Sequence, residues 1–131
     1  MATVVTTAGR AVAVNRLRGT GTEPLYIGWG TGAGTATTTA TSLFTETASD
    51  LSATTGSRIT GTSASYSTTV TGDTYRVTGT YTASDSGTVT NAGLFDASTI
   101  TAGNLFMYGD FTGIGLAAND AIAFTMDVVY G

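Results

Sequence analysis

The sequence lacks several residue types on which most enzymes and metalloproteins depend. Its 131 residues contain no cysteine, histidine, lysine or glutamine, and only one proline. The chain therefore has no disulfide, no thiolate or imidazole ligand for a metal, and no catalytic triad that passes through histidine. Without lysine it has no Schiff-base chemistry either. These absences favour a protein that is not an enzyme and uses no cofactor.

Charged residues are also rare. They make up 11% of the chain, against roughly 25% in an average soluble domain, and the net charge is −4. An acidic chain is a poor partner for nucleic acid, whose phosphates attract basic surfaces. The apolar runs are far shorter than the ~20 residues needed to cross a bilayer, and the N-terminus has no secretory-signal pattern. We therefore expect neither nucleic acid nor a membrane among its partners.

The few charges are unevenly distributed along the chain. All five cationic residues are arginines, and three of them, Arg10, Arg16 and Arg18, precede the first acidic residue, Glu23. Residues 1–22 thus carry a net charge of +3, and the remainder carries −7. Two interpretations stay open. The arginines are either solvated residues flanking a strand or part of a basic N-terminal arm that docks on an acidic partner.

Small residues suited to strands and turns are abundant, with 30 threonines, 10 serines and 18 glycines. The hydrophobic content of 41% is nevertheless high enough for a folded core. The clearest pattern has a period of two and predicts a C-terminal strand with one face in the core, formed by Ile122, Phe124, Met126, Val128 and Tyr130. No segment has the period of an amphipathic helix, so we expect helix at most as a turn near residues 41–51.

Short runs rich in branched and aromatic residues, separated by turn-forming residues, predict an all-β fold. The predicted strands are Thr3–Thr6, Ala11–Arg18, Leu25–Trp29, Arg58–Ser63, Ser67–Thr71, Thr74–Thr82, Thr88–Phe95, Leu105–Phe111 and Ala121–Tyr130. They indicate a single antiparallel β-sandwich, jelly-roll-like and of about eight short strands, with a small closed β-barrel as the alternative. We assign residues 1–22 to an extended N-terminal arm with the first strands, and residues 23–131 to the sandwich domain.

One long segment, Gly30–Thr41, has no large side chain to bury. It is either a flexible connector or an extended segment that becomes ordered against a neighbouring subunit. Two nearby aromatic residues, Tyr26 and Trp29, fit either a stacking platform for a sugar ring or the core of the domain.

Nine carboxylates remain as possible catalytic groups or metal ligands. A glycosidase needs only two carboxylates, so a small hydrolase stays a remote alternative. Several of the nine, among them Asp73, Asp85, Asp96 and Asp120, lie beside glycine, serine or asparagine, where such side chains cap turns. No clustered aspartate loop typical of a calcium site occurs, and GWGTGAG at residues 28–34 has neither the following helix nor the lysine of a phosphate-binding loop.

Several segments together resemble a group of small β-rich virion proteins of tailed bacteriophages, known as capsid decoration or cement proteins and sometimes described as tail-fibre proteins. The resemblance covers most of the chain. It is carried by the order of four elements, namely the IGWGTG loop at residues 27–32, LFTE at 43–46, NAGLFD at 91–96, and the alternating C-terminal strand AIAFTMDVVYG at 121–131.

This resemblance implies a structural protein with no catalytic, cofactor or metal residues. It implies a location on the outer surface of the capsid after synthesis in the bacterial cytoplasm, the major capsid protein as partner, and a homotrimer or another small homo-oligomer. We select Arg10, Arg16, Arg18, Tyr26 and Trp29 as the residues expected to contact the partner. A tail-fibre or tail-tip protein that binds host-surface glycan remains the alternative.

Overall fold

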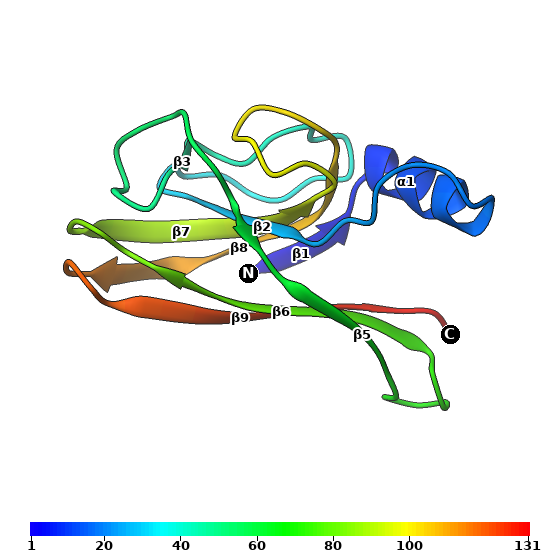
Figure 1. Cartoon of the computed structure of the whole chain (residues 1–131). Helices are drawn as coiled ribbons and strands as arrows, with labels where there is room; N and C mark the ends of the chain where they lie inside the picture. The colour runs from blue at the N-terminus through cyan, green and yellow to red at the C-terminus, as the bar shows by residue number, and fades with distance from the viewer.

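The computed structural model describes residues 1–131 as two antiparallel sheets that pack face to face, with one short helix at one end (Figure 1). The first sheet has the order β1 (Ala2–Val5), β8 (Leu105–Leu116), β7 (Gly87–Phe95), β2 (Tyr26–Gly30) and β3 (Glu46–Thr47), and β4 (Ile59–Thr60) also pairs with β2. The second sheet contains β5 (Thr62–Tyr66), β6 (Thr74–Thr82) and β9 (Ala121–Val129). The predicted β-sandwich is confirmed, and the sheets do not close into the alternative barrel.

The main core lies between the two sheets. Strand alternation directs Ile27, Val77 and Leu94 into it, each fully buried. Trp29 of β2 stacks on Tyr81 of β6, with ring centroids 3.9 Å apart, so this aromatic pair joins the two sheets across the core. The predicted C-terminal strand is confirmed as β9, although Tyr130 lies beyond its end and is 57% exposed.

A second, smaller cluster lies on the other face of the first sheet, beneath the loops drawn in cyan and yellow in Figure 1. The segment Gly30–Thr41 belongs to this cover. Ala36 is buried, its N–H donates to Asp110 Oδ1 at 2.8 Å, and the N–H of Thr37 donates to the Tyr108 hydroxyl at 2.8 Å. The segment is therefore neither a flexible connector nor dependent on a neighbouring subunit, because its own sheet holds it in place.

The helix α1 (Thr7–Leu17) replaces the strand predicted over Ala11–Arg18, and that prediction is wrong. Thr6 caps the first turn by accepting a hydrogen bond from Gly9 N–H at 2.9 Å. Gly19, at φ +78°, ends the helix in a Schellman motif, in which its own N–H and that of Thr20 return to carbonyls of the last turn. The two caps and several alanines stabilise the helix by more than its few β-branched residues destabilise it. The helix of this protein is not long and apolar enough to span a bilayer.

The N-terminal residues are built into the sandwich and do not form an extended arm. β1 pairs with β8 along its whole length. Thr6 then donates to β8 twice, from its N–H to Phe106 O at 3.1 Å and from its hydroxyl to Leu105 O. Gly9 lies so close to β8 that a Cβ atom on it would fall 2.0 Å from the Phe106 carbonyl oxygen. The start of α1 is thus fixed to the sheet by close backbone contact.

The chain crosses from the first sheet to the second at Gly61, between β4 and β5. A Cβ atom at Gly61 would lie 2.4 Å from Val77 Cγ1, so the crossing needs a residue without a side chain. The strand predicted over Ser67–Thr71 is wrong, since these residues form the tip of the β5–β6 hairpin. The turn of helix expected near residues 41–51 is also wrong, because this stretch contains the short strand β3.

Asp73 organises that hairpin tip. Its carboxylate accepts hydrogen bonds from the backbone N–H groups of Thr68, Thr69 and Val70, each at 2.9 Å, and from the Thr74 hydroxyl at 2.8 Å. These donors, the Val70 N–H foremost, hold the pKa of Asp73 far below its ordinary value. The side chain therefore satisfies the turn only in its ionised form.

We predict that Gly9→Ala destabilises the protein, although alanine is the better helix former by about 1 kcal/mol. The clash with the Phe106 carbonyl should cost about 2–3 kcal/mol, more than the helix propensity returns, and so reverse the sign of the effect. Chemical denaturation measures the effect. Gly115→Ala is the control, because a Cβ atom at Gly115 meets nothing within 4 Å. A stabilised Gly9→Ala variant would contradict the close contact.

We also predict that the Asp73 carboxylate makes part of the stability dependent on pH. Because its pKa is lower in the folded than in the unfolded chain, its contribution is complete above about pH 4 and is lost as the pH falls further. Asp73→Asn should lower the melting temperature at pH 7, and the difference from the native protein should shrink below about pH 3. Asp85→Asn, at a carboxylate that accepts one bond from Ser86 N–H, should leave the neutral melting temperature unchanged.

Candidate binding groove

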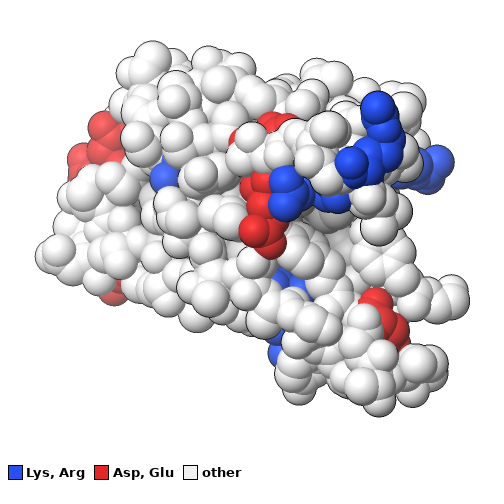
Figure 2. All heavy atoms as spheres, turned by 45° about the vertical axis from the view of Figure 1, so that its right-hand side comes forward, with Lys and Arg blue, Asp and Glu red and all other residues white.

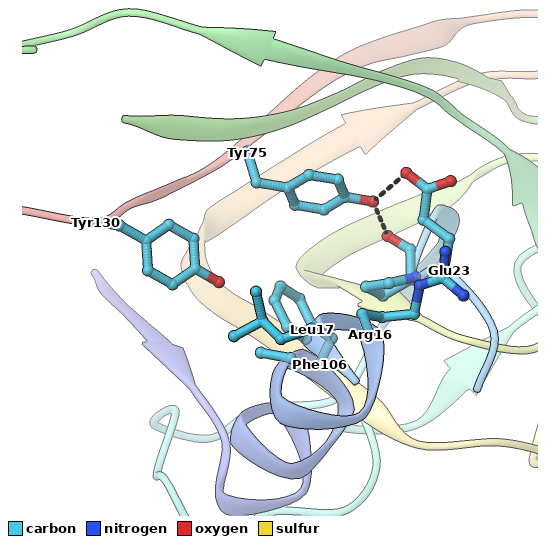
Figure 3. Close-up of a pocket in the computed structure, with 8 residues that line it drawn as sticks. Arg16, Leu17, Glu23, Tyr75, Phe106 and Tyr130 are labelled. Atoms are coloured by element: carbon cyan, nitrogen blue, oxygen red, sulfur yellow. Dashed lines mark hydrogen bonds between the residues drawn. The ribbon is translucent and has the colours of Figure 1, made fainter. Parts of the chain in front are cut away.

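A groove of about 480 Å³ lies between α1 and the ends of the two sheets (Figure 3). It combines residues from five separate parts of the chain, namely α1, the loop that precedes β2, strand β6, strand β8 and the C-terminus. The lining residues are Ala13, Arg16, Leu17, Glu23, Pro24, Tyr75, Phe106 and Tyr130.

The floor of the groove is aromatic. Tyr75 and Phe106 meet edge to face, with ring centroids 6.2 Å apart and an interplanar angle of 84°. The Tyr75 hydroxyl shares its single hydrogen between two acceptors, Pro24 O at 2.8 Å and Glu23 Oε1 at 3.2 Å. Burial, and secondarily the Glu23 carboxylate, raise the pKa of Tyr75 well above its ordinary value, so the hydroxyl stays protonated and ties the loop to β6.

The rim of the groove exposes large apolar side chains. Leu17 is 89% exposed and Tyr130 is 57% exposed, and both line the groove (Figure 3). Arg16 adds a charge beside them and donates from Nη1 to Gly21 O at 2.7 Å. A hollow with an aromatic floor, an apolar rim and a cation suits an apolar side chain of a partner that has a carboxylate nearby.

The predicted contact residues Arg10, Arg16 and Arg18 all lie on α1 or at its C-cap and are exposed. They gather at one end of the molecule, visible as the blue cluster in Figure 2. Only Arg16 lines the groove. None of the three forms an ion pair, whereas the other two arginines of the chain are each paired with a carboxylate.

The other two predicted contact residues, Trp29 and Tyr26, are less exposed than the three arginines. Trp29 is fully buried, stacks on Tyr81 and donates from Nε1 to Ala48 O at 3.1 Å. Its selection as a partner contact is therefore wrong, because the core needs the ring. Tyr26 alternates with it onto the opposite face of β2, where it is half-buried against the second cluster.

The groove residues Leu17, Tyr75, Phe106 and Tyr130 were not selected from the sequence. An apolar residue near a helix end becomes recognisable as a rim residue only once the helix is recognised. Thr6 as N-cap and Gly19 as the residue after the C-cap are the signals that mark this helix in the sequence.

A second hollow, of about 510 Å³, has a charged floor. Arg58 makes a bidentate ion pair with Glu46, with Nε–Oε1 at 2.6 Å and Nη2–Oε2 at 3.0 Å. Its Nη1 also donates to the carbonyls of Ala97 and Ala102, both at 2.8 Å, and its guanidinium lies 3.4 Å from the centre of the Phe95 ring. Because these contacts join the segment that contains Arg58 to strand β3 and to the β7–β8 loop, we interpret Arg58 as a structural residue.

The carboxylates are distributed among structural hydrogen bonds. Each of the nine accepts at least one hydrogen bond from this chain. The acceptors are Glu23, Glu46, Asp50, Asp73, Asp85, Asp96, Asp110, Asp120 and Asp127. Each of the two hollows is lined by a single carboxylate, so neither offers the facing pair that a glycosidase uses. No group of three or more acidic side chains is placed to hold a metal ion.

Comparison with protein-family models, with curated proteins and with solved structures found no match to this chain.

We predict that Arg58→Lys lowers the free energy of unfolding by about 2–4 kcal/mol. Lysine keeps the charge but loses the two-pronged pairing with Glu46 and the bonds to both loop carbonyls, which leaves buried acceptors unsatisfied. Arg76→Lys is the matched control, because the pair of Arg76 with Asp127 is about a quarter exposed, so solvent screens it and its weakening should cost less stability. Equal losses in the two variants, measured by urea denaturation, would contradict this role of Arg58.

Proposed function

We propose that this chain is a structural virion protein of a tailed bacteriophage, a capsid decoration protein that binds the lattice of the major capsid protein from outside. The order of segments that resembles such proteins supports this proposal. So does the architecture, a small β-sandwich whose carboxylates serve turns and ion pairs.

The observation that carries the proposal is the contrast between two classes of arginine. Arg58 and Arg76, in the body of the sandwich, are paired with carboxylates. Arg10, Arg16 and Arg18 are exposed, lack ion pairs and occupy one end of a protein whose net charge is −4 (Figure 2). Such a distribution orients the molecule, with its basic end toward an acidic surface and its acidic body away from it.

The groove beside α1 adds an apolar contact to this electrostatic one. Its exposed rim residues Leu17 and Tyr130 lie next to Arg16, so a lattice loop with an apolar residue and a nearby carboxylate matches both features. Binding to the assembled shell and not to free subunits stabilises the shell by linkage. A homotrimer or another small homo-oligomer at a symmetric lattice position gains further affinity through multivalency.

We predict that the triple variant Arg10→Gln, Arg16→Gln, Arg18→Gln folds but binds shells at least about tenfold more weakly, because each lost contact with an acidic surface costs up to about 1 kcal/mol. Cosedimentation with expanded capsids of the encoding phage, stripped of this protein, measures the binding. Native binding should also weaken as salt rises, since screening acts on exposed charges. The control variant Arg76→Gln, Asp127→Asn removes the exposed pair of the sandwich body and should bind as the native chain does.

Unchanged binding of the triple variant would rule out α1 as the anchor. The number of copies per virion, measured by quantitative mass spectrometry, tests the assignment to the head. Hundreds of copies support decoration of the shell, whereas a few copies would overturn it in favour of a tail protein that binds host glycan.

A further inference from the structure

The second sheet ends in an unprotected edge strand, β9. β6 is its only strand partner, so one side of β9 has no neighbour (Figure 1). We infer that this edge pairs antiparallel with β9 of a second copy of the chain, about a twofold axis, to form one continuous six-stranded sheet. The inference rests on the edge alone and is independent of the proposed binding to capsids.

The unpaired backbone groups of this edge can be identified by residue. β9 pairs with β6 without a break from Thr74↔Val129 to Thr82↔Ala121. Just beyond these ends, Tyr130 N–H donates to Asp73 O and Asp120 O accepts from Ala83 N–H, both at 2.8 Å. Even-numbered residues therefore bond to β6, and strict antiparallel alternation turns the N–H and C=O groups of the odd-numbered residues 121–129 outward.

β9 also lacks the features that keep edge strands apart. It contains no proline, no lysine and no bulge in its pairing. Its single charged side chain, Asp127, is neutralised by Arg76 at 2.6 Å. The other free edges are shorter: β1 and β3 have four and two residues, β5 has five, mostly exposed and polar, and β8 lacks a second strand neighbour only beyond its pairing with β1, over residues 111–116. β9, with nine residues, is the long open edge.

A second copy fits this edge because β9 is complementary to itself. With the twofold axis at Thr125, its middle residue, each outward-facing residue meets another outward-facing residue, and every free backbone group in residues 121–129 finds a partner. Asp127 then lies opposite Ala123 of the second copy, so no like charges meet. On the inner face, the half-buried Ile122 and Phe124 lie opposite Val128 and Met126, which extends the core across the axis.

The axis at Thr125 makes the inference testable by charge exchange. Thr125→Lys places two ammonium groups opposite each other, and Thr125→Glu places two carboxylates there. Each variant alone should dimerise at least about tenfold more weakly than the native chain at low salt. An equimolar mixture should restore dimerisation to within about threefold of native, because lysine then faces glutamate. Sedimentation velocity follows the change from the 13.2 kDa chain to twice that mass.

Thr80→Lys is the matched control. Thr80 is exposed on the same face of the sheet but lies on the central strand β6, so this variant should dimerise as the native chain does. Thermal unfolding of all variants confirms that they fold. Hydrogen exchange tests the same pairing in the native chain, without any substitution. The amides of Ala123, Thr125 and Asp127 should become protected from exchange as the protein concentration rises. The amides of Phe124 and Met126, which bond to β6, should be protected at every concentration.

Three results would overturn the inference: a native chain that stays monomeric at high concentration, a native trimer, or a Thr125→Lys variant that dimerises normally. Each of them leaves the proposed role of α1 intact, because the capsid experiment tests different residues at a different part of the molecule.

Discussion

The contact between Gly9 and the Phe106 carbonyl decides where the basic end of the protein lies. Because the backbone of α1 lies directly on β8, the helix has one position against the sheet, and its arginines are held at a defined place. The same contact positions one wall of the groove, since Arg16 and Leu17, which line it, follow Gly9 two turns later on the same helix. The groove and the charged cluster therefore depend on one close backbone approach.

The structure separates charges that maintain the fold from charges that remain free. The buried side chain of Arg58 pairs with Glu46 of β3 and bonds to the β7–β8 loop, and Asp73 holds a hairpin tip by accepting hydrogen bonds from backbone N–H groups. Charged groups that are bonded in this way have few hydrogen-bonding positions left for a partner. The three arginines without an ion pair are confined to α1 and its C-cap, so the paired and unpaired cations of this chain occupy different parts of the fold.

Much of the fold could be predicted from the sequence, because alternation over nine residues identifies a strand with one buried face, as it did for β6 and β9. The helix could not be found by periodicity, since α1 contacts the sheet through a glycine and only Val12 and Gly9 are buried along it. Its caps were the available signal. The sequence could not show whether Trp29 is buried or exposed, because aromatic residues on a short strand suit either environment. The groove joins residues as distant as Ala13 and Tyr130, and sequence does not reveal such proximity.

The first sheet is covered on both faces, by the second sheet on one side and by the loops over Phe95 and Leu105 on the other. The second sheet is covered on one face only. The free energy of local opening should therefore be lower in β5, β6 and β9 than in β2, β7 and β8. The first sheet is then the more rigid of the two, and the second is the more flexible. A flexible second sheet can adjust its twist when another strand pairs with its edge. The rigid first sheet meanwhile keeps α1 in a fixed position.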